Sequence, residues 1–185
     1  MRIFLLLIAC LAILCACYSA VAAEGSYNVK DFGAVGDGKA DDTAAIQAAL
    51  DKAKAGPRGS SVIMPAGEYR VTRPLTIENC LLTGLSSGGW PADAGPMPRF
   101  LVEHTEGPCI IAKDAASLHG LNFNYDHKGA AARKFGPTVL LAGNGISVTN
   151  LRIHQPYEGI MADGVTNIGR LNIENVFIIS ARECG

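Results

Sequence analysis

The sequence has no excess of positive charge, and this limits the partners that it can bind. Lysine and arginine number 16 against 17 aspartate and glutamate, for a net charge of −1, and aromatic residues make up 6% of the chain. A nucleic-acid-binding surface needs clustered Lys and Arg, so this balance argues against a nucleic-acid partner. The apolar run over residues 3–14 is also shorter than the about 20 residues that a membrane-spanning helix needs.

A hydroxyl residue is missing from a stretch that otherwise resembles a nucleotide-binding loop. Residues 33–42, GAVGDGKADD, fit most of G-x-x-x-x-G-K-[ST], but Ala40 stands where Ser or Thr would hold Mg²⁺. Asp41 and Asp42 follow at the expected helix start, where carboxylates repel phosphate and an Asp side chain is suited to cap the helix. The sequence therefore predicts a structural turn and no nucleotide partner.

The N-terminal segment, up to Ala23, has the organisation of a secretory signal peptide. Arg2 is followed by an apolar run over residues 3–14 and by small residues that end at 21–23. We expect cleavage after Ala23 and a secreted or periplasmic protein, with 15 basic and 17 acidic residues remaining. An alternative is that the stretch ending at Cys17 acts as a bacterial lipobox, in which case a lipidated Cys17 anchors the protein to a membrane.

Cysteine is scarce in the chain that remains after this cleavage. Cys80, Cys109 and Cys184 are left, and an odd number in an exported chain cannot all pair internally. Unpaired cysteine is among the most buried residue types, so we expect buried free thiols. The spacings do not fit a zinc site.

Helical spacing begins after Asp42. Apolar residues recur every three or four positions, at Ile46, Leu50 and Ala53. This stripe and the Gly-Pro stop at 56–57 predict an amphipathic helix over residues 42–55 that covers an apolar surface. Alternation over residues 62–77, interrupted by Pro-Ala-Gly at 65–67, predicts a strand, a turn and further strands.

These segments, VKDFGAVGDGKADDTAAIQAAL and SSVIMPAGEYRVTRPLTI, resemble the N-terminal signature of the pectate-lyase-like superfamily, which includes polygalacturonases, rhamnogalacturonases and phage tailspike-type proteins. The matching residues are Asp31, Phe32, Gly33, Ala34, Gly36, Asp37, Gly38, Asp41, Asp42, Thr43, Ala45, Ile46, Gln47, Pro65, Gly67 and Tyr69. The resemblance implies that this unit caps the narrow end of a right-handed parallel β-helix.

A repeated pattern supports coils independently of the resemblance. The motif aliphatic-x-x-aliphatic-x-aliphatic occurs at 148–153 and again at 173–178. LHGLNF at 118–123 is an earlier copy, and LTGLSS at 82–87 is a weaker match earlier still. Repeats at such spacings indicate a solenoid, so we expect an all-β, incomplete parallel β-helix of about three to four coils with an N-terminal capping α-helix.

The expected organisation has three segments: a signal peptide at 1–23, a capping unit at 24–80 and coils at 81–185, with loops near 86–99 and 125–137. The final residues, SARECG, fall inside a repeat, and nothing there resembles a cap. An open last coil presents an unpaired edge and an apolar core. We therefore expect the front part of a longer protein, with self-association through the open C-terminal coil as a possible interaction.

No catalytic residues can be assigned by sequence. The resemblance implies a polysaccharide partner and a glycoside hydrolase or polysaccharide lyase of pectinase type acting on an acidic polysaccharide, but the N-x-D, G-H-G and R-x-K motifs of polygalacturonases have no matching context. Asp41-Asp42 is interpreted as a helix cap. Glycoside cleavage needs two carboxyls at one bond, and a lyase needs a base and commonly calcium. No metal or cofactor is predicted, with Ca²⁺ implied only if the whole protein is a lyase.

Outward positions on the predicted coils supply candidate binding residues. Asn122, Arg152 and Phe177 form one column, and Asn124, His154 and Ile179 form a second. The hypothesis is that Arg152 and His154 contact an acidic sugar with Glu158 and Asp163 nearby, and that Trp90 stacks on a sugar ring. For the charged residues and His154 the alternative is plain solvated surface, and for Trp90 the alternative is that it covers the sheet. His104, His119 and His127 have no metal-ligand spacing.

The candidate functions are therefore three. The first is part of an exported carbohydrate-active β-helix enzyme, with no turnover by these 185 residues alone. The second is a non-catalytic polysaccharide-binding or surface β-helix module, and the third is a remnant without a function of its own. The functional hypothesis depends mainly on the fold, which by itself is compatible with many chemistries.

Overall fold

The computed structural model describes residues 25–84, 97–125, 134–179 and 181. The predicted signal peptide, the alternative lipid site at Cys17, the candidate Trp90 and Cys184 lie outside the described residues. Within the described ranges, no helix has the length and apolar character that a membrane crossing requires.

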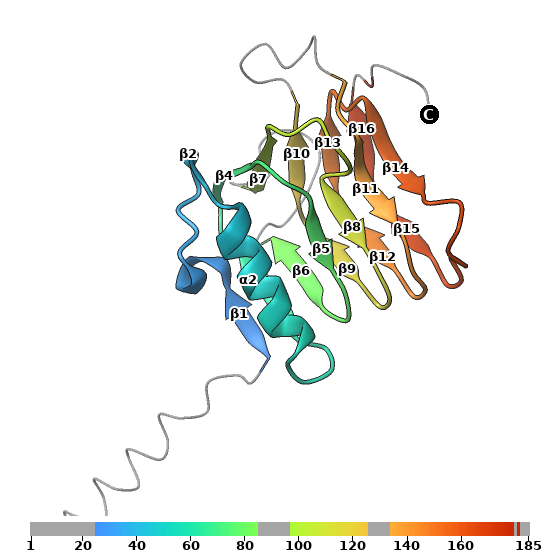
Figure 1. Cartoon of the computed structure of the whole chain (residues 1–185), viewed down its shortest axis with the longest axis horizontal. Helices are drawn as coiled ribbons and strands as arrows, with labels where there is room; N and C mark the ends of the chain where they lie inside the picture. Colours follow the sequence, from blue (N-terminus) through green and yellow to red (C-terminus); the bar gives the residue numbers. More distant parts are fainter. Residues whose placement is uncertain (1–24, 85–96, 126–133, 180, 182–185) are drawn as a thin grey trace, which may run out of the picture.

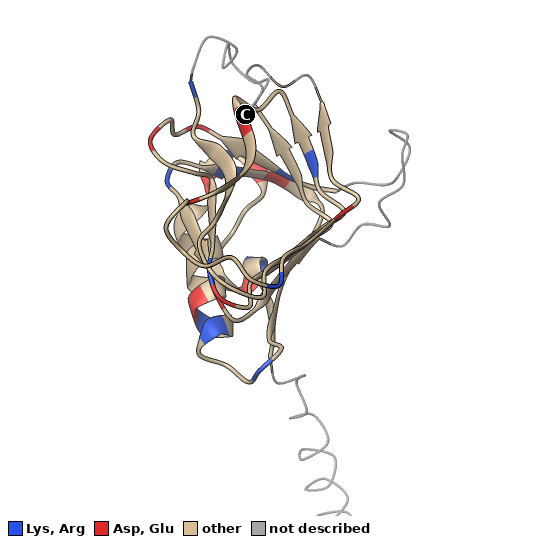
Figure 2. Cartoon of the chain, turned by 90° about the vertical axis from the view of Figure 1, so that its right-hand side faces the viewer, with Lys and Arg blue, Asp and Glu red and all other residues tan. Residues whose placement is uncertain are grey.

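Three parallel sheets surround a common interior and give the described part of the chain a three-sided cross-section (Figures 1 and 2). Sheet A contains β1 (Ser26–Asn28), β3 (Ser61–Met64), β6 (Leu81–Gly84), β9 (Ser117–His119), β12 (Ser147–Thr149) and β15 (Asn172–Glu174). Sheet B contains β2 (Asp37–Asp41), β4 (Gly67–Val71), β7 (Pro98–Val102), β10 (Asn122–Asn124), β13 (Arg152–His154) and β16 (Phe177–Ile179). Sheet C contains β5 (Leu75–Ile77), β8 (Ile110–Ala112), β11 (Pro137–Leu141) and β14 (Glu158–Ala162).

The chain visits sheets A, B and C in turn and then begins the next coil. Among the described residues this makes four complete turns, β3–β5, β6–β8, β9–β11 and β12–β14, with partial turns at both ends. This is the predicted fold, an incomplete right-handed parallel β-helix. The strands on either side of residue 80 pair in register, so the sheets continue across the boundary predicted between the capping unit and the coils.

The register confirms the sequence repeat. Leu82, Leu118, Val148 and Ile173 are aligned partners on neighbouring strands of sheet A, which reproduces the alignment predicted from the repeated motif. Each side chain that has a coil on both sides is wholly buried, whereas Ile173 in the last described coil is 46% exposed. Burial in this column therefore comes from the neighbouring coils.

A parallel column fills the interior beneath sheet B. Tyr69, Phe100, Phe123 and Ile153 are register partners and fully buried. The rings of Phe100 and Phe123 stack with centroids 4.8 Å apart and planes 7° from parallel. The core is thus continuous from β4 to β13. The strands that carry the outward residues of sheet B are therefore held in place by close packing beneath them.

Corner residues explain a further part of the repeat. Asn150 and Asn175 have φ of 54° and 52°, and Gly120 at the equivalent corner has φ of 65°. Asn and Gly are the residues that best tolerate this left-handed conformation. The Asn175 side-chain amide donates to Asn150 Oδ1, so the two corners are linked. The recurrence of Asn in successive repeats therefore marks the turns from sheet A to sheet B.

Helix α2 (Thr43–Lys54) covers the N-terminal end of the stack and packs on β5, β1, β3 and the 3-10 helix η1 (Val29–Phe32) (Figure 1). It buries Ile46, Leu50 and Ala53, as the sequence predicted. The helix begins after Asp42 and ends before Ala55, in agreement with the predicted bounds. Gln47 fixes it to β5, because its side chain accepts from Thr76 N at 2.9 Å and donates to Thr76 O at 3.1 Å.

Three expectations about loops need correction. The predicted turn over residues 33–42 contains strand β2, which pairs with β4 through a register shift. The loop predicted at 86–99 ends earlier, because β7 begins at Pro98. The loop predicted at 125–137 ends earlier, because β11 begins at Pro137, and residues 126–133 lie outside the described part. On either side of them Tyr125 and Phe135 are buried and pack edge to face with ring centroids 4.9 Å apart. Their aromatic side chains belong to the interior of the coil stack.

The two described cysteines, Cys80 and Cys109, are buried free thiols, as predicted. Burial raises the pKa of the Cys80 and Cys109 thiols. A buried thiol with a raised pKa stays protonated and is a poor nucleophile. The structure therefore gives neither cysteine a chemical role.

Candidate functional site

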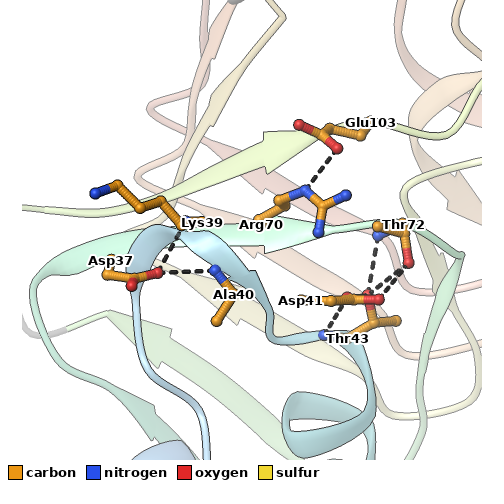
Figure 3. Close-up of polar contacts among 8 residues, drawn as sticks. All are labelled: Asp37, Lys39, Ala40, Asp41, Thr43, Arg70, Thr72 and Glu103. Atoms are coloured by element: carbon orange, nitrogen blue, oxygen red, sulfur yellow. Dashed lines mark hydrogen bonds and ion pairs between the residues drawn. The ribbon is translucent and has the colours of Figure 1, made fainter.

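A polar network joins β2, the start of α2 and the end of β4 (Figure 3). Asp41 accepts from Thr43 N at 3.1 Å, from the Thr43 hydroxyl, and from Thr72 Oγ1 at 2.7 Å. The Thr43 hydroxyl oxygen in turn accepts from Thr72 N at 2.9 Å. Partial burial acts to raise the pKa of Asp41, but the hydrogen bonds from Thr43 and Thr72 outweigh it and hold the pKa below its usual value.

The neighbouring carboxylate, Asp42, is almost wholly buried and holds the glycine turn. It accepts from Val35 N at 2.6 Å and from Gly36 N at 3.1 Å. The prediction that an Asp caps the helix therefore needs correction for Asp42, whose side chain makes no capping bond. Asp41, not Asp42, accepts from the first helical N–H. Both carboxylates have structural partners, so the Asp-Asp pair is not a catalytic pair.

Other residues of the recognised signature are structural as well. Tyr69 is buried, and its hydroxyl donates to Pro65 O at 2.9 Å. Gly36 has φ of 65°, and a Cβ there would lie 3.0 Å from the Tyr69 ring. A Cβ on Gly67 would lie 2.8 Å from Gly36 O. The signature thus marks a tightly packed turn against sheet B, and its glycines are required by close approach.

One ion pair and a carboxylate that accepts backbone hydrogen bonds complete this end of sheet B. The Arg70 guanidinium contacts Glu103 Oε2 at 2.6 Å (Figure 3). Asp37 accepts from Ala40 N at 2.9 Å and from Lys39 N at 2.8 Å, and these backbone hydrogen bonds lower its pKa. The carboxylates drawn in Figure 3 are therefore all engaged within the fold.

A different polar surface follows the outer face of sheet B toward the later coils. Four outward residues on successive strands are register partners: Glu68, Arg99, Asn122 and Arg152. We call these four the sheet B row. A second column beside it contains Arg70, Leu101, Asn124 and His154. The two columns predicted from the repeat, including their last members Phe177 and Ile179, are confirmed as register partners.

Basic side chains gather in the middle of this surface. Arg99 Nη1 contacts Glu68 Oε1 at 2.9 Å, and both side chains are about half exposed. Burial lowers the pKa of His154, and the positive charges of Arg99 and Arg152 lower it further. Three basic groups thus share the outer face of sheet B, with Arg152 and His154 on β13 and Arg99 two strands away on β7. His154 is accordingly neutral near pH 7.

Asn122 lies between the two arginines in the row and differs from its neighbours. Its side chain points outward, yet the residue is only 9% exposed. Its Oδ1 atom is buried and has no hydrogen-bond partner among the residues that the structure describes. A buried acceptor without a donor costs about 1–3 kcal/mol. No residue pattern indicated this, because an outward Asn on a strand is ordinarily solvated.

The predicted binding residues are only partly brought together. Arg152 and His154 face the same side of β13, as expected from their spacing. Glu158 begins β14 in sheet C, and its backbone carbonyl accepts from Thr138 Oγ1 at 3.2 Å. Asp163 follows the other end of β14, where it accepts from Val165 N at 2.9 Å and Thr166 N at 2.8 Å. Asp163 therefore stabilises its own turn, and hydrogen bonds from Thr166 and Val165 lower its pKa.

Two hollows lie near the turn between β4 and β5. These shallow depressions share Arg73 and Pro74, one bordered by α2 and the other by residues 103–106. His104 lines the second hollow, with its Nδ1 positioned to donate to Glu106 O at 3.1 Å. Across the described ranges, no three His, Cys, Asp or Glu side chains are grouped to hold a metal. The calcium site that a lyase would imply thus has no fitting residues there.

Comparison with known proteins supports the same fold. Residues 26–92 match the family described as rhamnogalacturonase A/epimerase, pectate lyase-like. A stretch of 94 residues, 51% of this chain and 12% of the relative, is 53% identical to mannuronan C5-epimerase AlgE4 of Azotobacter vinelandii. A shorter stretch of 47 residues, 25% of this chain and 5% of the relative, is 70% identical to alginate lyase 7 of the same organism. The chain thus spans a small part of these relatives.

The solved A-module of mannuronan C5-epimerase AlgE6 of Azotobacter vinelandii superposes with a TM-score of 0.57 at 23% identity, over 74% of this chain and 40% of that one. The stacked parallel sheets and this superposition define a parallel β-helix protein. The matched N-terminal segment, residues 26–92, is similar to the pectate-lyase-like family, which agrees with the resemblance found in the sequence.

Proposed function

We propose that this chain binds an acidic, uronate-containing polysaccharide along the outer face of sheet B, as part of a polysaccharide-acting protein. The observation that carries the proposal is the cluster of Arg99, Arg152 and His154 on that face. Guanidinium groups bind carboxylates with geometry and charge that other side chains do not supply. The names of the relatives, mannuronan epimerase and alginate lyase, support a uronate polymer.

The spacing of the sheet B row suits an extended sugar chain. Neighbouring strands lie about 4.8 Å apart, which is close to the length of one sugar residue in an extended polysaccharide. Arg99 and Arg152 are two strands apart and therefore separated by about 10 Å along the stack. A polymer that runs along the axis of the β-helix places carboxylates of alternate sugars at the two arginines, with the intervening sugar over Asn122.

Binding without turnover is proposed for residues 1–185. The carboxylates beside the row have partners within the fold, since Glu68 pairs with Arg99 and Glu103 pairs with Arg70. Cleavage of a glycosidic bond needs two carboxyl groups at that bond, or a base beside it. Measurable epimerisation or chain cleavage by the purified chain would replace this part of the proposal with a catalytic one.

The test is calorimetric titration of the purified chain with polymannuronate oligosaccharides, with a neutral dextran oligosaccharide of equal length for comparison. We expect binding of the polyuronate only, with affinity that falls as salt rises. Arg152→Gln should lower the affinity about tenfold, because a hydrogen bond to a charged group contributes about 1.5–3 kcal/mol. Arg58→Gln, which removes an exposed arginine between α2 and β3, is the matched control. Equal binding of dextran would contradict the proposal.

A further inference from the structure

We propose that Asn122 is the residue of the sheet B row that selects the sugar, by accepting a hydrogen bond at Oδ1 from a free sugar hydroxyl. The polysaccharide favoured by the row then turns the carboxylates of alternate residues toward the two arginines and an unsubstituted hydroxyl of the residue between them toward Asn122. This inference rests on the proposed function, which requires only the arginines. Asn122 adds selection among uronate polymers of the same charge.

The first argument is that this acceptor is unused in the free protein. Asn122 is 9% exposed and its Oδ1 has no partner in the described ranges. Other side chains on the same face have theirs, because Arg99 contacts Glu68 and Arg70 contacts Glu103. Buried polar atoms in folded proteins are paired as a rule, and an exception calls for an explanation. A hydroxyl donor brought by a ligand satisfies this atom.

The second argument is the position of the amide between two cations. Asn122 is the register partner of Arg99 on β7 and of Arg152 on β13. A carboxylate held by either arginine leaves the adjacent sugar over the strand between them, which is β10. A sugar in that place presents ring hydroxyls, and an amide oxygen is an acceptor for them. The order Arg, Asn, Arg therefore matches the order carboxylate, hydroxyl, carboxylate along the polymer.

The third argument is how the acceptor becomes accessible. Because Oδ1 is covered in the free chain, a ligand must displace the atoms that cover it. The flanking Arg99 and Arg152 have long, rotatable stems. The proposal therefore includes a movement of these two side chains: when their guanidinium groups pair with sugar carboxylates, the stems swing away from β10 and the amide becomes accessible. Carboxylate binding and hydroxyl recognition are then coupled. A neutral sugar chain makes neither the ion pairs with the arginines nor the hydrogen bond to Asn122.

The experiment combines protein variants with a chemically altered ligand. The probes are polymannuronate oligosaccharides and the same oligosaccharides with their hydroxyls acetylated, which keeps the carboxylates and removes the donors. We expect wild-type affinity to fall about tenfold on acetylation, the loss of one hydrogen bond in a buried site. Asn122→Leu has nearly the same volume and no acceptor, so it should bind both probes equally, at the wild-type affinity for the acetylated one.

A stability readout separates this role from a structural one. If the acceptor is unpaired in the free protein, Asn122→Leu shifts the urea unfolding midpoint upward or leaves it unchanged, because it removes a buried unsatisfied atom. A lower midpoint would show that Asn122 has a structural partner and would overturn the proposal. Asn122→Ala, which also lacks the acceptor and cannot clash, gives the same binding comparison if the leucine variant folds poorly.

Failure of this inference is distinguishable from failure of the proposed function. If Arg152→Gln weakens binding but the wild-type chain does not discriminate against acetylated ligand, the row binds uronates and the role of Asn122 is wrong. If the wild-type chain does not bind the unmodified polyuronate, the proposed function is wrong, and the selection by Asn122 is overturned with it. If acetylation weakens wild-type and Asn122→Leu binding equally, the hydroxyl is recognised by another residue, which also contradicts the inference.

Discussion

Two polar regions share sheet B, and they differ in whether their hydrogen bonds are complete. In the N-terminal region, Asp41 and Asp42 together accept five hydrogen bonds from described donors. Further along, the sheet B row holds two arginines around Asn122, whose buried oxygen has no partner in the described part. Both regions are rich in polar residues, so composition does not distinguish them. The difference teaches that the satisfied carboxylates stabilise this fold, whereas the unsatisfied oxygen of Asn122, which lies between two arginines, points toward a ligand.

The largest expected effect tests the structural side of this comparison. Asp42→Ala leaves the amides of Val35 and Gly36 without their carboxylate partner. Because the site is almost wholly buried, we expect a loss of about 3 kcal/mol in the free energy of unfolding. Urea denaturation measures it, and Asp51→Ala on the exposed face of α2 is the control. Polyuronate affinity of the folded fraction should not change; a parallel loss of affinity would break the distinction between the two regions.

The next effect tests the binding side. The double variant Arg99→Gln/Arg152→Gln should lower polyuronate affinity by about 2–3 kcal/mol, or some 30- to 150-fold, because both charge-assisted contacts are lost. Stability should change by less than about 1 kcal/mol, since the Arg99–Glu68 pair is half exposed and surface ion pairs contribute little. Calorimetric titration and urea denaturation of the same preparation give both values. A stability loss as large as that of Asp42→Ala would show that the row is structural.

Much of the fold could be predicted because its signals are local. The offsets between Leu82, Leu118, Val148 and Ile173 give the register of sheet A directly. The spacing of Arg152 and His154 likewise places them on one face of a strand. Repeats report periodic burial, and each coil is one period.

The rest could not be predicted because it depends on contacts between segments that are far apart in the sequence. Asp42 looked like a helix cap, but its partners are the amides of Val35 and Gly36 in the preceding turn. The contribution of Arg99 to the site was missed, since β7 does not carry the repeated motif and only sheet pairing aligns it with Asn122. The buried state of Asn122 Oδ1 is a property of packing, and no residue pattern encodes it.

A smaller effect on stability is expected from the loss of a single hydrogen bond in the N-terminal network, the one that the Thr72 hydroxyl donates to Asp41. Thr72→Val removes the bond from Thr72 Oγ1 to Asp41 but keeps the amide that donates to Thr43. We expect a loss of about 1 kcal/mol in the free energy of unfolding near pH 7. The exposed Thr105, changed to Val, is the matched control. A variant as stable as the wild type would show that this hydrogen bond is replaced by water.

The pH dependence of the same variant follows from Asp41. Its pKa is below the usual 3.8 in the folded state, so ionised Asp41 stabilises the fold above that pH, and this stabilisation is lost as pH falls through the folded pKa. Thr72→Val removes one of the causes of the lowered pKa. The difference between variant and wild type should therefore be full at pH 7 and shrink below pH 3.8.

The smallest expected effect concerns His154, which should influence the pH dependence of both stability and polyuronate binding. Its pKa is lowered from 6.5 by burial and by Arg99 and Arg152, so the unfolded chain binds this proton more readily than the folded one. Stability should accordingly fall as pH decreases below 6.5.

Sugar carboxylates beside the arginines offset their charge and raise the pKa of His154, so polyuronate binding takes up a proton and tightens a few-fold between about pH 7 and pH 5. His154→Gln should bind with an affinity that is flat over this range. Because burial also lowers the pKa of His104, His154→Gln should remove only part of the pH dependence of stability. If the pH dependence of polyuronate binding is the same in His154→Gln as in the wild type, His154 lies outside the region that the polymer contacts.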